Sequence, residues 1–310
     1  MYISSIQSEI QIKYIHSHGL TSLLALSDGR IVTGGSNGEI CITSIDYVTM
    51  EWKCDIEIEK AHNYNVSFLL ELNGLKLVSA SGDYTIKIWM INENDLQEIK
   101  ILKQHTKNVY KVIPLFNELK IASCSKDCTI RIWSNINNLY QQETILSENK
   151  EVYALIESKY NKNLLIISCN GYLSFWDVLL CLKLNIIQNI FTKRNNGLIE
   201  IENEIIAVSQ ANPAKIILIS SKSYTIIKEI QDINYIRWNS SLSLIYNNSL
   251  LYAYDGCFLQ ISKMNEEYTI VYKTFIDYKE LNGSDGLIAI VGKYIISDIG
   301  YGGFGVFRYK

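Results

Sequence analysis

The sequence predicts an all-β protein, a closed seven-bladed β-propeller whose blades are four-stranded antiparallel sheets. Three observations predict this fold. A motif that ends in tryptophan recurs at Trp89, Trp133 and Trp176, at intervals of 44 and 43 residues. Short stretches rich in Ile, Val, Leu, Tyr and Thr alternate with turn signals such as Asp28-Gly29. The chain also begins with a strand-like stretch that is out of step with the repeat.

The repeat is clearest in two units, LVSASGDYTIKIW ending at Trp89 and IASCSKDCTIRIW ending at Trp133, and IISCNGYLSFW ending at Trp176 is a weaker copy. Four degenerate copies of the unit occur at the same interval along the sequence, which brings the number of repeat units to seven. These copies end at or near Thr43, Ile219, Ser262 and Phe307. A period of about 40 to 45 residues built from short strands is typical of a propeller. A six-bladed or open ring is the alternative, because the last three units keep only the strand pattern and the period.

A helical solenoid of similar period is the other architecture to weigh. Long segments with a 3.6-residue period are absent, and β-branched residues dominate the apolar positions. The pattern therefore favours strands, and we expect four short antiparallel strands in each unit.

The first 15 residues are expected to close the ring. The stretch SEIQIKYI, ahead of His18, resembles QEIKILK, which precedes His105 and should form an outer fourth strand. The chain stops at residues 307–310, after the third strand of the seventh unit. Residues 1–15 would then complete the last blade, which removes an exposed sheet edge and makes residues 1–310 a single domain with no residues left for another. A frayed N-terminus is the alternative.

Composition argues against nucleic acid and membranes as partners. The 29 Lys and Arg residues against 32 Asp and Glu give a net charge of −3, so the chain lacks the positive field on which non-specific nucleic-acid binding depends. No apolar run is long enough to span a bilayer, and we expect no membrane insertion. With 48% hydrophobic and 20% charged residues, the chain can bury a large core.

The cysteines indicate a reducing compartment. Seven are present, an odd number, without a C-x-x-C pair or zinc-finger spacing. The N-terminal MYISSIQSEI lacks the basic region followed by an apolar one that marks a secretory signal. We therefore expect free thiols and a cytoplasmic protein.

Two units carry a more specific pattern, in which a His precedes the unit, a Ser lies on the second strand, an Asp in the next turn, and a Trp ends the third strand. The Ser-to-Asp spacing is four residues and the Asp-to-Trp spacing six in both. The residues are His62, Ser79, Asp83 and Trp89 in one unit and His105, Ser123, Asp127 and Trp133 in the next. These units resemble WD repeats. The resemblance implies a buried relay in which Trp meets Ser, Ser meets His, and His meets Asp, with a structural role.

The resemblance weakens in the neighbouring units. Blade one keeps His18, Thr33 and Asn37 but has Thr43 where the Trp would stand. Blade four has the only Trp-Asp dipeptide, at residues 176–177, with Asn170 in the Asp position.

A Ser, a His and an Asp in one blade also suggest a nucleophilic triad, but a Ser held within a sheet has no oxyanion hole or open cleft beside it. We expect no enzyme.

The glycine-rich GYGGFGVF lacks the following helix that a dinucleotide site needs. The four histidines lie in equivalent loops around the ring, which places three of them in separate blades, so no metal site and no cofactor are expected.

The function expected is that of a non-catalytic protein–protein interaction scaffold, a subunit or adaptor of a larger assembly. A propeller that binds a small ligand or carries a hydrolytic site in its central channel is the alternative, although no such site is visible in the sequence.

Partner binding is expected on the narrow face of the ring, which in WD-repeat proteins is formed by the loops entering the first strand and those joining the second and third. Tyr110, Tyr153 and Arg237 each follow the first apolar position of an innermost strand, and Lys126 lies in a turn on the same face. Tyrosine and arginine are enriched at binding hot spots. The hypothesis requires Tyr110 and Tyr153 to be partly exposed, and simple packing between blades is the alternative.

Overall fold

The computed structural model describes residues 6–12, 15–136, 139–190, 197–202, 204–210, 215–231, 241–244, 250–254, 257–264, 267–275, 288–291, 294–300 and 303–309. These residues form strands, turns and loops, and no helix occurs among them. The described strands, β1 to β28, form seven four-stranded sheets. The prediction of an all-β chain built from four-stranded antiparallel sheets is confirmed, and a helical solenoid is excluded for this part of the chain.

Six of the sheets take four strands that follow one another along the chain. Sheet one comprises β2 (Leu20–Ala25), β3 (Ile31–Gly35), β4 (Ile40–Ile45) and β5 (Trp52–Ile58). Sheet two comprises β6 (Val66–Leu72), β7 (Lys76–Ser81), β8 (Ile86–Ile91) and β9 (Leu96–Leu102). Sheet three comprises β10 (Val109–Leu115), β11 (Lys120–Ser125), β12 (Thr129–Ser134) and β13 (Gln141–Ser147). Sheet four comprises β14 (Val152–Glu157), β15 (Leu164–Cys169), β16 (Tyr172–Asp177) and β17 (Leu182–Gln188). Sheet five comprises β18 (Leu198–Glu200), β19 (Ile205–Gln210), β20 (Lys215–Ser220) and β21 (Thr225–Gln231). Sheet six comprises β22 (Ser241–Leu244), β23 (Leu250–Tyr254), β24 (Cys257–Met264) and β25 (Glu267–Phe275).

Sheet seven joins the two ends of the sequence. It comprises β26 (Ile288–Val291), β27 (Tyr294–Gly300), β28 (Gly303–Tyr309) and, as its outer strand, β1 (Ile6–Ile12). The antiparallel register pairs Ile6 with Tyr309 and Ile12 with Phe304. Ile12 and Phe304 are buried in one cluster with sheet one. The described part of the first 15 residues thus covers the edge of β28, which would otherwise be open to pairing with another chain.

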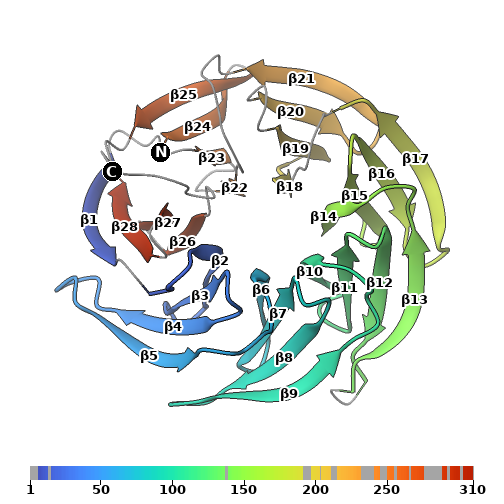
Figure 1. The fold of residues 1–310 in the computed structure, drawn as a ribbon. Helices are drawn as coiled ribbons and strands as arrows, with labels where there is room; N and C mark the ends of the chain where they lie inside the picture. The colour runs from blue at the N-terminus through green and yellow to red at the C-terminus, as the bar shows by residue number, and fades with distance from the viewer. Residues whose placement is uncertain are drawn as a thin grey trace.

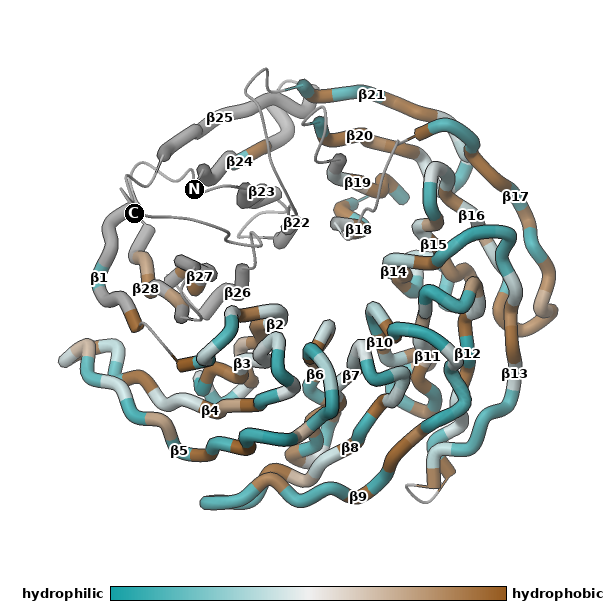
Figure 2. The backbone as a smooth tube through the Cα atoms, viewed as in Figure 1, coloured by the Kyte–Doolittle hydropathy of each residue, from teal (hydrophilic) through white to brown (hydrophobic). Residues whose placement is uncertain are grey.

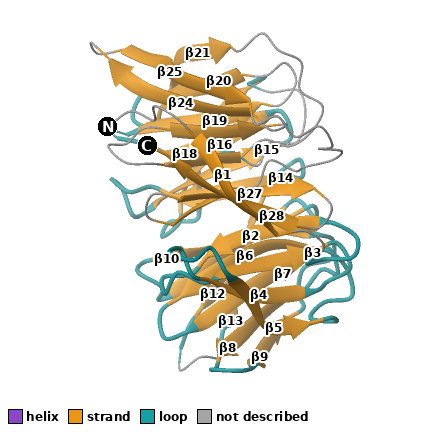
Figure 3. Ribbon diagram, turned by 90° about the vertical axis from the view of Figure 1, so that its left-hand side faces the viewer, coloured by secondary structure: helices purple, strands orange, loops and turns teal. Residues whose placement is uncertain are grey.

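The sheets stand around a common axis, with the first strand of each sheet innermost and the fourth outermost (Figure 1). Neighbouring innermost strands contact one another in chain order from β2 to β26, and β26 contacts β2. Seen from the side, the strands run across the thickness of the ring and the connections gather at its two faces (Figure 3). The architecture is consistent with a propeller.

The hydrophobic core lies between the sheets. Each strand directs alternate side chains to the two faces of its sheet, and each face packs on a neighbouring sheet, so inner strands are apolar on both faces. Every residue of β15 is buried, for example, whereas the outer strand β17 alternates with exposed positions. The outer strands β5, β9 and β13 carry long hydrophilic stretches (Figure 2). One buried cluster spans sheets three and four, and similar clusters lie between the sheets before and after them.

A repeated carboxylate contact ties consecutive sheets together, and the sequence analysis did not foresee it. In each case a glutamate at or just after the end of one sheet's first strand accepts a hydrogen bond from a backbone N–H in the first turn of the preceding sheet. The pairs are Glu71 with Ser27 (2.7 Å), Glu118 with Asn73 (2.8 Å), Glu157 with Phe116 (2.8 Å) and Glu200 with Lys159. Sheets one to five are therefore linked by charge-assisted hydrogen bonds in addition to apolar packing.

Candidate functional site

Sheet two brings together the four side chains that the repeat predicts. His62, in the loop between β5 and β6, has its Nε2 2.7 Å from Ser79 Oγ and its Nδ1 3.0 Å from Asp83 Oδ2. Trp89 Nε1 donates to the same Ser79 oxygen over 2.8 Å. Since an indole nitrogen can only donate, the Ser79 hydroxyl directs its own proton to His62 Nε2, and His62 Nδ1–H then donates to Asp83. The four groups form one chain of hydrogen bonds.

Sheet three repeats the arrangement. His105 Nε2 lies 2.8 Å from Ser123 Oγ, His105 Nδ1 lies 2.8 Å from Asp127 Oδ2, and Trp133 Nε1 donates to Ser123 Oγ over 2.9 Å. Both relays are buried at the His and Ser positions. The same spacing of residue types therefore produces the same geometry in two neighbouring sheets.

The carboxylates of both relays are held in their charged form. Burial raises the pKa of Asp83 and Asp127, but the hydrogen bonds from the relay His and from Thr85 or Thr129 more than offset it, and the pKa of each Asp lies well below its ordinary value. Burial also lowers the pKa of His105, in opposition to Asp127. In sheet three the relay thus pairs a neutral imidazole with a carboxylate.

The geometry does not offer either serine as a nucleophile. Ser79 and Ser123 are fully buried on the second strands of their sheets. Each oxygen already accepts from an indole and contacts an imidazole, so a substrate carbonyl could not approach it. What the arrangement does is satisfy polar groups that would otherwise be unpaired inside the blade, each at a cost of about 1 to 3 kcal/mol.

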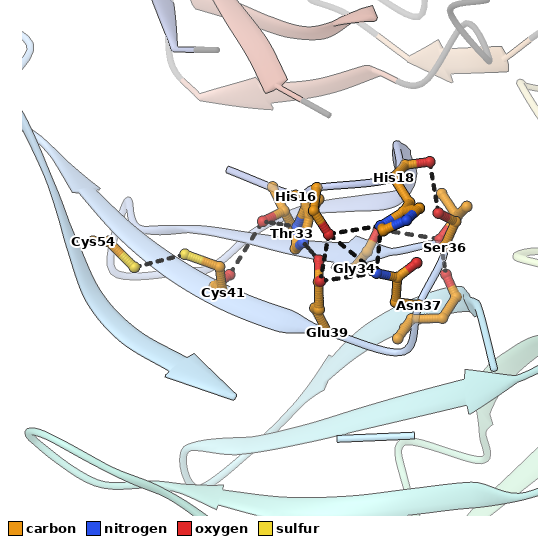
Figure 4. Close-up of polar contacts among 12 residues, drawn as sticks. His16, His18, Thr33, Gly34, Ser36, Asn37, Glu39, Cys41 and Cys54 are labelled. Carbon is orange, nitrogen blue, oxygen red and sulfur yellow. Dashed lines mark hydrogen bonds and ion pairs between the residues drawn. The ribbon is translucent and has the colours of Figure 1, made fainter. Parts of the chain in front are cut away.

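Sheet one carries a variant of the relay, and the expected residues need correction. His16 fills the His position instead of His18: its Nε2 lies 2.8 Å from Thr33 Oγ1 and its Nδ1 lies 2.9 Å from Glu39 Oε2 (Figure 4). His18 is exposed, 2.7 Å from Asn37 Nδ2. Glu39 supplies the carboxylate because it stands two residues after Asn37, and its side chain, one methylene longer than that of Asp, reaches His16.

The turn that contains Asn37 is packed closely on the next relay. His62 N donates to Gly38 O over 2.9 Å, and a Cβ at Gly38 would lie 2.1 Å from His62 O. Gly38 also has a φ of +89°, which glycine adopts without strain. A glycine is therefore required where the turn of sheet one meets the His62 loop.

Sheet four replaces the relay with a buried glutamate that sequence reasoning missed. Glu148 Oε1 accepts from Trp176 Nε1 at 2.6 Å, and Lys183 Nζ lies 2.7 Å from Glu148 Oε2. Tyr172 also donates to this carboxylate. Asn170, expected in the Asp position, lies in the turn between β15 and β16, where its backbone N–H donates to the Glu151 carbonyl. The available signal was an acidic residue two positions after the last apolar residue of β13. It lies in the loop between β13 and β14, which corresponds to the loop that holds His105 ahead of sheet three.

The candidate partner residues Tyr110 and Tyr153 lie together, each as the second residue of its innermost strand. Their ring centroids are 5.3 Å apart with planes inclined at 48°. Tyr110 is partly exposed, but Tyr153 is buried at 7% exposure, so the expectation that both rings are partly exposed is wrong for Tyr153. The Tyr153 hydroxyl donates to Glu151 at 2.6 Å, and Lys126 Nζ lies 3.7 Å from the other oxygen of Glu151. Arg237 lies outside the described residues.

These groups share one face of the ring, which we call the loop face. It is formed by the loops between sheets, which hold the relay histidines, and by the turns that join second and third strands, which hold Lys126. The opposite face, formed by the turns that join first to second and third to fourth strands, we call the turn face. Antiparallel strands place these two sets of connections at opposite ends of every sheet.

Among the described residues, no group of three or more His, Cys, Asp and Glu side chains could hold a metal ion. Cys41 and Cys54 lie with their sulfur atoms 2.8 Å apart as free thiols (Figure 4). No helix long and apolar enough to cross a membrane occurs in the part of the chain that the structure describes.

Comparison with known families identifies one segment. Residues 96–134 match the model of the WD domain, G-beta repeat. The match runs from β9 to β12 and contains all four relay residues of sheet three, His105, Ser123, Asp127 and Trp133. No curated protein shows significant similarity to the chain.

Proposed function

From the premise that this chain contains a WD repeat at residues 96–134, we propose that it is a non-catalytic scaffold for protein–protein interaction, a cytoplasmic subunit or adaptor of a larger assembly. WD repeats generally mediate contacts between proteins. In this proposal the seven sheets are the blades of one closed propeller that spans residues 1–310. The relays keep the blades rigid, and the loop face receives the partner.

The observation that carries the proposal is the partly exposed Tyr110 on the loop face, with the buried Tyr153 as its support and not as a second contact residue. Tyr110 presents a partly exposed ring whose other side rests against the buried ring of Tyr153. Tyr153 is in turn fixed by its hydrogen bond to Glu151. An aromatic ring that is already held in place loses little conformational entropy on binding, and tyrosines of this kind are common binding hot spots.

Lys126 and Glu151 give this aromatic surface a polar rim. Their side chains are 44% and 31% exposed, and 3.7 Å separates the charged atoms. An exposed ion pair of this kind contributes little to stability, so it can exchange its partner at small cost. Aromatic centre and polar rim together match the composition of protein interfaces.

The test is to purify the tagged chain from its native source with three variants and compare the proteins that accompany it. Tyr110→Ala and Lys126→Glu should each remove partners that the wild-type chain retains. Tyr160→Ala is the matched control, because Tyr160 is 51% exposed in the turn between β14 and β15, on the turn face. If both loop-face variants keep every partner, or if only Tyr160→Ala loses them, the proposal is wrong.

A further inference from the structure

Lys111 occupies an unusual place for a lysine. It is the third residue of β10, an innermost strand, directly after Tyr110. A β-bulge between Val109 and Lys111 interrupts the alternation of side chains, and Lys111 pairs with Cys124 on β11. Lys111 is partly exposed, and burial lowers the pKa of its ammonium group.

No carboxylate compensates this ammonium group among the residues that the structure describes. The ammonium group makes a cation–π contact with the ring of Phe68 on the adjacent innermost strand β6, with Nζ 5.6 Å from the ring centroid. Other half-buried lysines have acidic partners: Lys87 lies 2.7 Å from Glu98 and Lys120 lies 2.6 Å from Glu143. Within the described part of the chain, Lys111 has no ion pair of this kind.

An ammonium group that has lost hydration without gaining a carboxylate destabilises the folded chain, and the face of one aromatic ring recovers only part of the loss. Natural proteins keep locally destabilising groups of this kind mainly at functional sites, where a bound ligand can compensate the charge. A ligand for Lys111 would be anionic, and it would approach beside Tyr110.

Charges at the same end of β10 and β14 favour the same kind of ligand. Lys107 and Lys150 are exposed on the loop face, in the loops that lead into these strands, and neither forms an ion pair within the described part of the chain. The nearby acids already have donors: Glu151 accepts from Tyr153 and faces Lys126, and Asp127 belongs to the relay. Among the described residues of these loops, the charge that has no ion-pair partner is therefore positive.

We propose that the loop face binds an acidic peptide segment of a partner protein, and that one carboxylate of this segment pairs with Lys111 beside the ring of Tyr110. The inference rests on the proposed function and names the chemistry of the partner. A carboxylate matches Lys111 because it balances the charge of one ammonium group.

The test uses fluorescence anisotropy with two labelled, C-terminally amidated octapeptides, one of alternating leucine and glutamate and one with glutamine in place of glutamate. The wild-type chain should bind the glutamate peptide at least tenfold more tightly. Lys111→Met should remove at least tenfold of this affinity and leave binding of the glutamine peptide unchanged. Lys162→Met is the matched control, since Lys162 is an exposed lysine on the turn face, and it should change neither affinity by more than twofold.

A second readout separates recognition from a structural role. Because Lys111→Met removes an uncompensated charge and keeps the length of the side chain, its melting temperature should rise by about 2 °C or more. A fall in the melting temperature would show that the ammonium group stabilises the fold, and this would overturn the inference. Failure of the wild-type chain to prefer the glutamate peptide, or an unchanged affinity in Lys111→Met, would also overturn it. Either result leaves the proposed function standing if Tyr110→Ala still loses partners.

Discussion

Replacing Asp127 with alanine removes the acceptor at the end of the relay in sheet three. Asp127 Oδ2 accepts from His105 Nδ1 and from the backbone of Thr106, while Oδ1 accepts from the backbone and the hydroxyl of Thr129. Thr106 is exposed, so water replaces its lost partner. His105 is 4% exposed, and its Nδ1–H would keep only the long contact to Thr129 Oγ1 (3.4 Å), so losing the carboxylate should cost about 1 to 3 kcal/mol. The half-buried bonds to Thr129 add about 1 kcal/mol, so we expect a total loss of about 2 to 4 kcal/mol.

Urea unfolding followed by tryptophan fluorescence measures this loss as a shift of the midpoint at unchanged slope. Asp95→Ala is the control, because Asp95 is exposed in the turn between β8 and β9, and it should change stability by less than about 0.5 kcal/mol. Since the pKa of Asp127 is depressed in the folded chain, its contribution is complete above the ordinary value of 3.8 and is lost as the pH falls below it. The difference between wild type and Asp127→Ala should therefore shrink at acid pH. Equal midpoints for Asp127→Ala and Asp95→Ala at pH 7 would refute the relay.

Three further predictions follow from the described contacts. Deleting residues 1–15 should expose the edge of β28 and lower the melting temperature or cause aggregation in light scattering, and an unchanged melting temperature would contradict the role of β1. Glu148→Gln should cost about 3 kcal/mol in urea unfolding because it leaves Lys183, which is 25% exposed, without its counter-ion; a loss below about 1 kcal/mol would show that the pair is unimportant. Burial lowers the pKa of His16 and His105 in the folded chain, so the unfolded chain takes up protons first as the pH falls below 6.5, and stability should fall from pH 7 to pH 5.5. A flat stability profile over that interval would contradict their buried, neutral state.

The parts of the fold that sequence reasoning reached are those where chemistry recurs at a fixed interval. The two tryptophan motifs placed both relays residue by residue, because the register is regular and antiparallel. Trp89 pairs with Leu77 and Trp133 with Ile121, so each Trp lies diagonally across from the Ser two residues further along the second strand, on the same face of the sheet. The likeness of the N-terminal stretch to an outer strand indicated the pairing of β1 with β28, since the same alternation of apolar residues recurs in both stretches.

The errors arose where a loop or a bulge breaks that regularity. His16 and His18 lie two residues apart in the same loop. Only the folded conformation of this loop decides which imidazole reaches Thr33. Glu148 was missed because a carboxylate can replace a whole relay when it accepts directly from the indole, which changes both the residue type and its position.

The candidate binding surface shows the same limit. A β-bulge between Val109 and Lys111 removes the simple alternation that would otherwise tell which of Tyr110 and Lys111 faces a neighbouring strand. The burial of Tyr153 depends on its contact with Tyr110 from another sheet and on its hydrogen bond to Glu151. Neither contact follows from the local pattern of the strand.

The central claim is that a partner protein docks on the loop face at Tyr110, and site-specific photo-crosslinking tests it most directly. A benzophenone amino acid is introduced at position 110 in one variant and at position 160, on the turn face, in another, and both are irradiated in extract from the native source. Docking at Tyr110 should give a discrete protein adduct from position 110 that is absent at position 160 and that disappears when Lys126→Glu is added. Adducts from position 160 alone, or an adduct at position 110 that Lys126→Glu leaves unchanged, would contradict it.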